Sequence, residues 1–178
     1  MARKMYFASG NKKQSIDWFT GKIKDASRVF SGAFYRRAML NRVEALRKST
    51  YIGKMYFFYY DPKLKDKLPI YDRFPLVFPI EQYSDGFLGL NLHYLTTDER
   101  DELLGKLMEY SNGKGINPRT TLALSYDLIK NVSKLAALGR PCIKRYLFSQ
   151  VRSPFVEVIP SEWKNAIDLP VELFVGKR

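Results

Sequence analysis

The dipeptide Asp85-Gly86 stands between two apolar runs and predicts a β-hairpin. Residues 76–83 precede the turn, and residues 87–95 follow it with leucines that alternate with small or polar residues. Such alternation is typical of a strand with one buried face. Because Pro79 has no N–H to donate, the first run is expected to form an edge strand or an irregular extended segment. Two strands joined in this way are antiparallel, which disfavours a doubly wound parallel sheet.

Other segments predict further strands and helices around the hairpin. The aromatic run 54–60 predicts a strand, and the polar, proline-rich residues 61–75 indicate a long loop. Segment 97–112 carries acidic residues in its first turn and leucines at helical spacing, so we expect a helix with Thr97 as its N-cap. We also expect helices at 126–138 and 143–151, a strand at 155–159, a short helix capped by Ser161 and a last strand at 171–175. The fold class is therefore α+β with a small antiparallel sheet and several helices, and a partly open barrel stays an alternative arrangement of the strands.

The positive charge is concentrated near the N-terminus. The chain has a formal net charge of +12, and residues 1–50 contain twelve basic and three acidic side chains, which leaves only +3 for residues 51–178. Apolar residues recur at helical spacing in 14–30 and 35–48, so two basic amphipathic helices are expected there. The sequence thus predicts a basic helical N-terminal arm at 1–50 and an α+β body at 51–178.

A surplus of this kind indicates an anionic partner, which is nucleic acid, a phospholipid surface or an acidic protein surface. A solvated helix face is the alternative explanation. Gly21 and Ser31-Gly32 interrupt the apolar stripe, and no apolar run approaches the ~20 residues needed to span a bilayer, so no membrane partner and no export signal are expected. The residues expected to bind the partner are Lys22, Lys24, Arg28, Arg36, Arg37, Arg42, Arg47 and Lys48.

Common catalytic and metal-binding patterns do not occur in the sequence. The single cysteine, Cys142, excludes an intrachain disulfide, and the single histidine, His93, excludes sites that need two histidines. There is no P-loop, dinucleotide-binding fingerprint or nucleophile elbow. We therefore expect no catalytic residue, no metal and no cofactor. His93 is expected on the polar face of a strand, and Cys142 is expected to be a small buried apolar residue.

A metal-dependent nuclease is the enzymatic alternative, because basic surfaces and acidic clusters coexist in such enzymes. Glu162-x-Lys164 resembles the second half of a common nuclease signature, but Glu162 follows a helix cap and no Pro-Asp precedes it. The acidic residues in question are Asp61, Asp66, Asp72, Glu81 and Asp85.

Three stretches of the chain resemble small virion proteins of T4-like contractile-tailed bacteriophages. They are residues 55–95 (MYFFYYDPKLKDKLPIYDRFPLVFPIEQYSDGFLGLNLHYL), CIKRYL at 142–147 and SEWKNAIDLPVELF at 161–174. The resemblance implies a non-enzymatic structural subunit of the virion, assembled in the host cytoplasm, with the tail or baseplate as its expected place. On this hypothesis the body docks on neighbouring tail or baseplate proteins with acidic surfaces, and the arm anchors it in an oligomeric assembly.

A DNA-binding protein of the virion, at the genome end or associated with packaging, is the main alternative. In that case the arm arginines would contact phosphates, which makes binding strongly salt-dependent. No helix-turn-helix, zinc finger or RNP motif supports this alternative. Tyr56, Phe58 and Tyr60 lie on one face of the expected strand, where they would either stack on unpaired bases or pack in the core.

Overall fold

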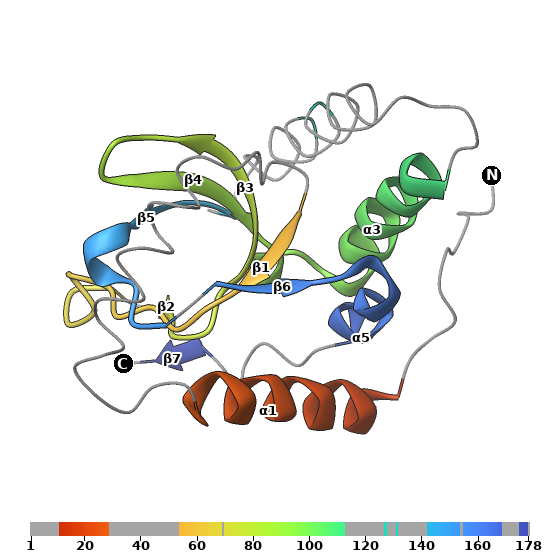
Figure 1. The fold of residues 1–178 in the computed structure, drawn as a ribbon, viewed down its shortest axis with the longest axis horizontal. Helices are drawn as coiled ribbons and strands as arrows, with labels where there is room; N and C mark the ends of the chain where they lie inside the picture. Colours follow the sequence, from red (N-terminus) through yellow and green to blue (C-terminus); the bar gives the residue numbers. More distant parts are fainter. Residues whose placement is uncertain are drawn as a thin grey trace.

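A curved antiparallel sheet of five strands lies at the centre of the fold (Figure 1). The computed structural model describes residues 11–28, 54–68, 70–112, 127, 131, 142–153, 155–168 and 175–177. The strands are β1 (Met55–Phe57), β2 (Ile70–Asp72), β3 (Leu76–Gln82), β4 (Gly86–Asn91), β5 (Ile143–Leu147), β6 (Val156–Val158) and β7 (Val175–Lys177). The helices are α1 (Lys12–Arg28), α3 (Thr97–Asn112) and α5 (Lys164–Ile167), with 3₁₀ turns η1 (Leu92–Tyr94), η2 (Phe148–Gln150) and η3 (Pro160–Glu162).

The strand order of the main sheet is β5-β4-β3-β1-β6, and each neighbouring pair is antiparallel. β2 and β7 form a separate antiparallel pair. The main sheet is not closed into a barrel. This arrangement confirms the predicted α+β class with a small antiparallel sheet.

The hairpin of β3 and β4 is confirmed, but β3 is the central strand of the sheet and not an edge strand. Two local features explain how Pro79 is accommodated there. The register with β4 shifts between Pro79 and Glu81, which marks a bulge, and bulges tolerate a residue without an N–H. In addition, the ladder with the short strand β1 involves only Leu76 and Val77, so Pro79 has no ladder partner on that side.

The two faces of the sheet carry different cores. One face packs against α1, α3 and α5 through the larger apolar cluster, which includes the completely buried Phe19. The other face carries an aromatic cluster of Phe58, Tyr60, Val77, Phe87, Tyr146 and Val151. Tyr56 is 6% exposed and Tyr60 is 7% exposed, so the aromatic side chains of this strand pack in the core and are not free to stack on bases.

Helix α3 is confirmed, although its capping residue is Thr96 and not Thr97. Thr96 Oγ1 accepts a hydrogen bond from the N–H of Glu99, and the Glu99 carboxylate accepts one from the N–H of Thr96 at 2.6 Å, which is a capping box. One turn later, the buried Arg100 donates through Nε to the carbonyls of η1 and the following residue, and through Nη1 to two carbonyls of α5. This side chain therefore holds α3, η1 and α5 together.

The predicted helix at 143–151 is wrong, because this segment forms strand β5 followed by η2. All five residues of β5 pair with β4, and this non-local ladder outweighs the helical spacing of the apolar residues. The predicted loop at 61–75 contains β2, and the strand at 155–159 is confirmed as β6. The short helix is α5, which follows η3 without a side-chain cap from Ser161. The last strand is β7, shifted toward the C-terminus of the chain.

The N-terminal helix expected at 14–30 is present as α1, and its buried residue Phe19 belongs to the core of the body. The second arm helix, at 35–48, and most of the helix at 126–138 lie outside the described residues. The division of the chain at residue 50 stays a prediction. None of the described helices is both long and apolar enough to cross a membrane.

Candidate nucleic-acid interface

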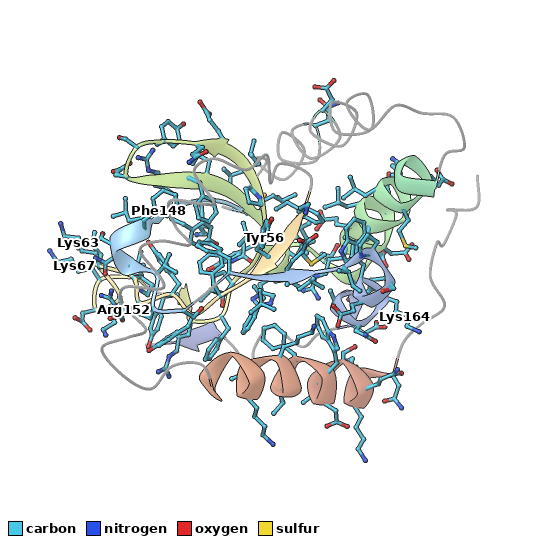
Figure 2. The ribbon with its side chains drawn as sticks, in the orientation of Figure 1. Tyr56, Lys63, Lys67, Phe148, Arg152 and Lys164 are labelled. Carbon is cyan, nitrogen blue, oxygen red and sulfur yellow. The ribbon has the colours of Figure 1, made fainter. Side chains whose placement is uncertain are left out.

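The loop 61–68 between β1 and β2 carries three exposed lysines at alternate positions, Lys63, Lys65 and Lys67. Backbone hydrogen bonds fix the start of this loop beside η2, since the N–H of Asp61 donates to Gln150 and the N–H of Arg152 donates to Tyr59. Figure 2 shows Lys63, Lys67 and Arg152 extending from the same end of the molecule, with Lys164 at the opposite end. We call the exposed set Lys63, Lys65, Lys67, Arg73 and Arg152 the basic end.

The basic end keeps a positive balance despite the two carboxylates in its loop. Asp61 accepts a hydrogen bond from Lys65 Nζ at 2.9 Å, and this bond is the main reason that the pKa of Asp61 lies below its ordinary value. The charges of Arg152 and Arg73 lower that pKa further, which places both arginines near the loop. Five cations against Asp61 and Asp66 leave a local surplus of positive charge suited to phosphates.

A cavity of about 210 Å³ opens under the same loop. Tyrosines from four separate segments line it, and we call it the tyrosine cavity. Two leucines of the loop, Leu64 and Leu68, also line it and are 54% and 37% exposed. Its lining is completed by Tyr60, Pro62, Lys63, Tyr71, Asp72, Asn91, Tyr94, Lys144, Arg145 and Tyr146.

Charged groups and tyrosine rings are held against each other at the cavity. Lys144 Nζ lies 4.4 Å from the centre of the Tyr94 ring, and burial lowers the pKa of this lysine. Burial, with a smaller contribution from the charge of Asp72, raises the pKa of Tyr94 to about 12. Arg145 bonds to the carboxylate of Asp85 and lies over the Tyr83 ring. Because its pKa is raised, the hydroxyl of Tyr94 stays protonated at neutral pH.

A buried polar network lies behind the cavity wall, and it contains His93. The prediction that His93 lies on the polar face of a strand is wrong, because β4 ends at Asn91 and the chain turns into η1. Asn91 Oδ1 accepts from the N–H of His93, and the side chain of His93 becomes 1% exposed. Its Nδ1 lies 2.6 Å from Asp72 Oδ2, which also accepts from Asn91 Nδ2. The His93 ring packs edge-on against Phe19, and its Nε2 has no hydrogen-bond partner among the residues that the structure describes.

The structure describes three of the arm residues expected to bind a partner. Lys22 Nζ lies 2.7 Å from Glu162 Oε1 and is paired within the chain, Lys24 is exposed on α1, and Arg28 ends that helix. The binding role of all eight residues stays a prediction. The remaining five, Arg36, Arg37, Arg42, Arg47 and Lys48, lie outside the described residues.

Several of the acidic residues considered for a nuclease have partners within the chain. Asp61 pairs with Lys65, Asp85 with Arg145, and Glu162 with Lys22. Within the part of the chain that the structure describes, no group of three or more His, Cys, Asp or Glu side chains could hold a metal ion. The prediction that Cys142 is a buried apolar residue is confirmed, and burial raises the pKa of its thiol.

Neither the basic end nor the tyrosine cavity was predicted from the sequence. The alternating lysines of the KLKDK run were visible, but a run of this kind in a loop is typical of any solvated surface. The cavity joins positions from 60 to 146, and only the pairing of β3, β4 and β5 brings them together.

Comparison with known proteins identifies the family. The family model described as the phage T4 terminal DNA protecting protein matches residues 3–178, whereas no curated protein and no solved structure matches the chain. The match supports a bacteriophage protein of the virion, as the resemblance implied, but it corrects the expected place, because it does not support a tail or baseplate component. The chain belongs to the family of the phage T4 terminal DNA protecting protein.

Proposed function

We propose that this protein binds the ends of linear duplex DNA in the virion and protects them by occupying them, without catalysing a reaction. The observation that carries the proposal is the family match over residues 3–178, whose description names protection of terminal DNA. The basic end supplies a surface of the right charge on the described part of the chain.

The physical basis of binding is the neutralisation of phosphates. Each phosphate contacted by Lys or Arg releases condensed counterions, so log K falls against log salt with a slope of about −0.9 per contact. The exposed cations of the basic end would make such contacts from one side of the molecule. The arm residues from Lys24 to Lys48 would add a second set, which accounts for the positive surplus near the N-terminus.

The tail or baseplate hypothesis explained the same charge by acidic protein neighbours. The phosphates of a DNA end would neutralise that charge equally well, and terminal DNA is what the family description names. We therefore place DNA first among the partners of this chain.

The decisive experiment compares DNA with and without ends. Binding of the full-length protein is measured on a linear duplex and on a covalently closed circle of the same sequence, and each is then challenged with an exonuclease. We expect tighter binding to the linear form and slower digestion from its ends. Equal affinity for both forms, with no protection from digestion, would overturn the proposal.

A matched pair of variants then tests the basic end. Lys67→Glu places a negative charge on this surface, and Lys164→Glu makes the same change at the opposite end of the molecule (Figure 2). We expect Lys67→Glu to weaken end binding at least about tenfold and to lower the salt slope by about 1, as loss of one phosphate contact does. Lys164→Glu should leave both quantities nearly unchanged. Equal effects of the two variants would mean that the basic end is not the interface.

A further inference from the structure

We propose that the tyrosine cavity takes the unpaired terminal nucleotide of a DNA strand, with the base inside and its phosphate at the cationic rim. The inference rests on the proposed function, and it adds which kind of DNA end the protein prefers. We predict that the protein prefers a frayed or single-stranded DNA end to a fully paired blunt end.

The size and walls of the cavity suit one flat ring. At about 210 Å³ it is smaller than the roughly 300–1,000 Å³ of most small-molecule sites, so it has room for a single compact group. Its lining includes Tyr71 and Tyr94, which are half-buried and can present a ring to a base, together with Leu64 and Leu68, whereas Tyr60 and Tyr146 are buried. Aromatic side chains bind unpaired bases by stacking on the π-face that every base has, and this recognition tolerates any sequence.

The polar groups of the cavity are already fixed in place. Asn91 Nδ2 donates to Asp72 at 2.9 Å and lies 3.0 Å from the hydroxyl of Tyr146. Tyr94 is held under Lys144 and keeps its hydroxyl proton at neutral pH. The edge of a base carries both donors and acceptors, so tyrosine hydroxyls at the wall can bond to it. A site with groups held in this way loses little entropy when the ligand binds.

The cations at the rim distinguish a nucleotide from a purely apolar ligand. Lys63, Lys144 and Arg145 line the cavity, and Lys63 belongs to the basic end as well. A DNA strand whose phosphates bind along the basic end would therefore reach the mouth of the cavity directly. An apolar peptide would not need these cations, and an acidic peptide would not need the tyrosine rings.

One exposed leucine and one exposed isoleucine allow a clean test. Leu64, at the cavity, is 54% exposed, and Ile159, which does not line the cavity, is 49% exposed. Leu64→Glu places a negative charge at the cavity without removing a buried side chain, and Ile159→Glu is the matched control. Both variants are expected to fold, which urea unfolding checks.

The measurement uses the full-length protein and three probes: a blunt duplex, the same duplex with a short unpaired extension, and that extended duplex with 2-aminopurine as its terminal base. We expect wild type and Ile159→Glu to bind the extended duplex about tenfold more tightly than the blunt one, and to quench the 2-aminopurine by stacking. Leu64→Glu should lose this preference and the quenching. Because its charge also stands between Lys63 and Lys65 and weakens binding to both kinds of end, the readout is the ratio of the two affinities.

The outcomes separate this inference from the proposed function. Equal affinity for blunt and extended ends, or unquenched 2-aminopurine in the wild-type complex, overturns the cavity proposal but leaves end binding intact. Equal affinity for circular and linear DNA, with no protection from digestion, overturns the proposed function itself. Unchanged preference in Leu64→Glu would also count against the cavity, because the charge stands at its mouth.

Discussion

The carboxylate of Asp72 and the imidazole of His93 lie 2.6 Å apart in a site where their side chains are 4% and 1% exposed. The same carboxylate accepts hydrogen bonds from Asn91 Nδ2 and from the N–H of Phe74. One side chain therefore joins β2, the end of β4 and η1. It also forms part of the wall of the tyrosine cavity.

Replacement of Asp72 by asparagine is expected to destabilise the fold. One carboxylate oxygen becomes an amide nitrogen, so buried donors of Asn91, His93 or Phe74 lose their acceptor, which costs about 2–4 kcal/mol. Urea unfolding of Asp72→Asn measures the loss. Asp66→Asn is the control, because Asp66 is exposed and its change should stay within about 0.5 kcal/mol. Equal stability of Asp72→Asn and wild type would contradict the role assigned to this network.

Two glycines predict opposite effects of the same substitution. A Cβ at Gly86 would lie 2.0 Å from the backbone carbonyl oxygen of Tyr146, and that oxygen is held in the β4–β5 ladder. Gly86→Ala should therefore lower the free energy of unfolding by about 1–3 kcal/mol. A Cβ at Gly21 meets nothing within 4 Å, and alanine favours a helix over glycine, so Gly21→Ala should raise stability by about 1 kcal/mol. Thermal unfolding of both variants checks the signs.

The ion pair between Lys22 and Glu162 predicts acid sensitivity of the contact between α1 and the η3 turn. Burial alone would raise the pKa of Glu162, but hydrogen bonds from Lys22 and Trp18 and the charge of Lys22 hold it below its ordinary value. A lowered pKa in the folded state stabilises the fold above the unfolded pKa, and this contribution is lost as pH falls below about 4.3.

A double-mutant cycle with Lys22→Ala and Glu162→Gln measures this contribution by urea unfolding at neutral and acid pH. The coupling energy should be about 0.5–1 kcal/mol at pH 7 and should disappear at pH 3. A coupling that does not change with pH would show that the carboxylate charge is not involved.

The buried tyrosines predict alkaline sensitivity. Burial raises the pKa of Tyr94 to about 12 and raises the pKa of Tyr60 and Tyr146 as well. A tyrosine with a raised pKa binds its proton more tightly in the folded state, so its contribution to stability declines as pH rises above about 10. Ultraviolet titration should show late ionising tyrosines. Tyr94→Phe should remove one of them and weaken the decline of stability above pH 10.

The sequence was sufficient where the structure depends on local signals. Helix α3 follows from acidic residues in its first turn and from leucines at helical spacing, and the β3–β4 hairpin follows from Asp85-Gly86. The α+β class followed from these elements. Each of them is determined by residues within one short segment.

The sequence was insufficient where distant strands decide the outcome. β5 is a strand because all five of its residues pair with β4. Its own residues do not alternate clearly between buried and exposed positions, so the segment alone does not indicate a strand. His93 becomes buried because Asn91 ends β4 and turns the chain. The tyrosine cavity needs the loop 61–68, η1 and β5 at once, so no single segment could predict it.

The pairing of β1 with β6 has a consequence for synthesis of the chain on the ribosome. Phe57 pairs with Val156, so about 100 residues must be translated between the two partners. At about 5–20 residues per second, the interval lasts roughly 5–20 s. Through those seconds the outer edge of β1 has open N–H and C=O groups, which another nascent strand can pair with. Polysomes that crowd many copies of this chain together are therefore where misassembly would begin, and slower translation would prolong that exposure.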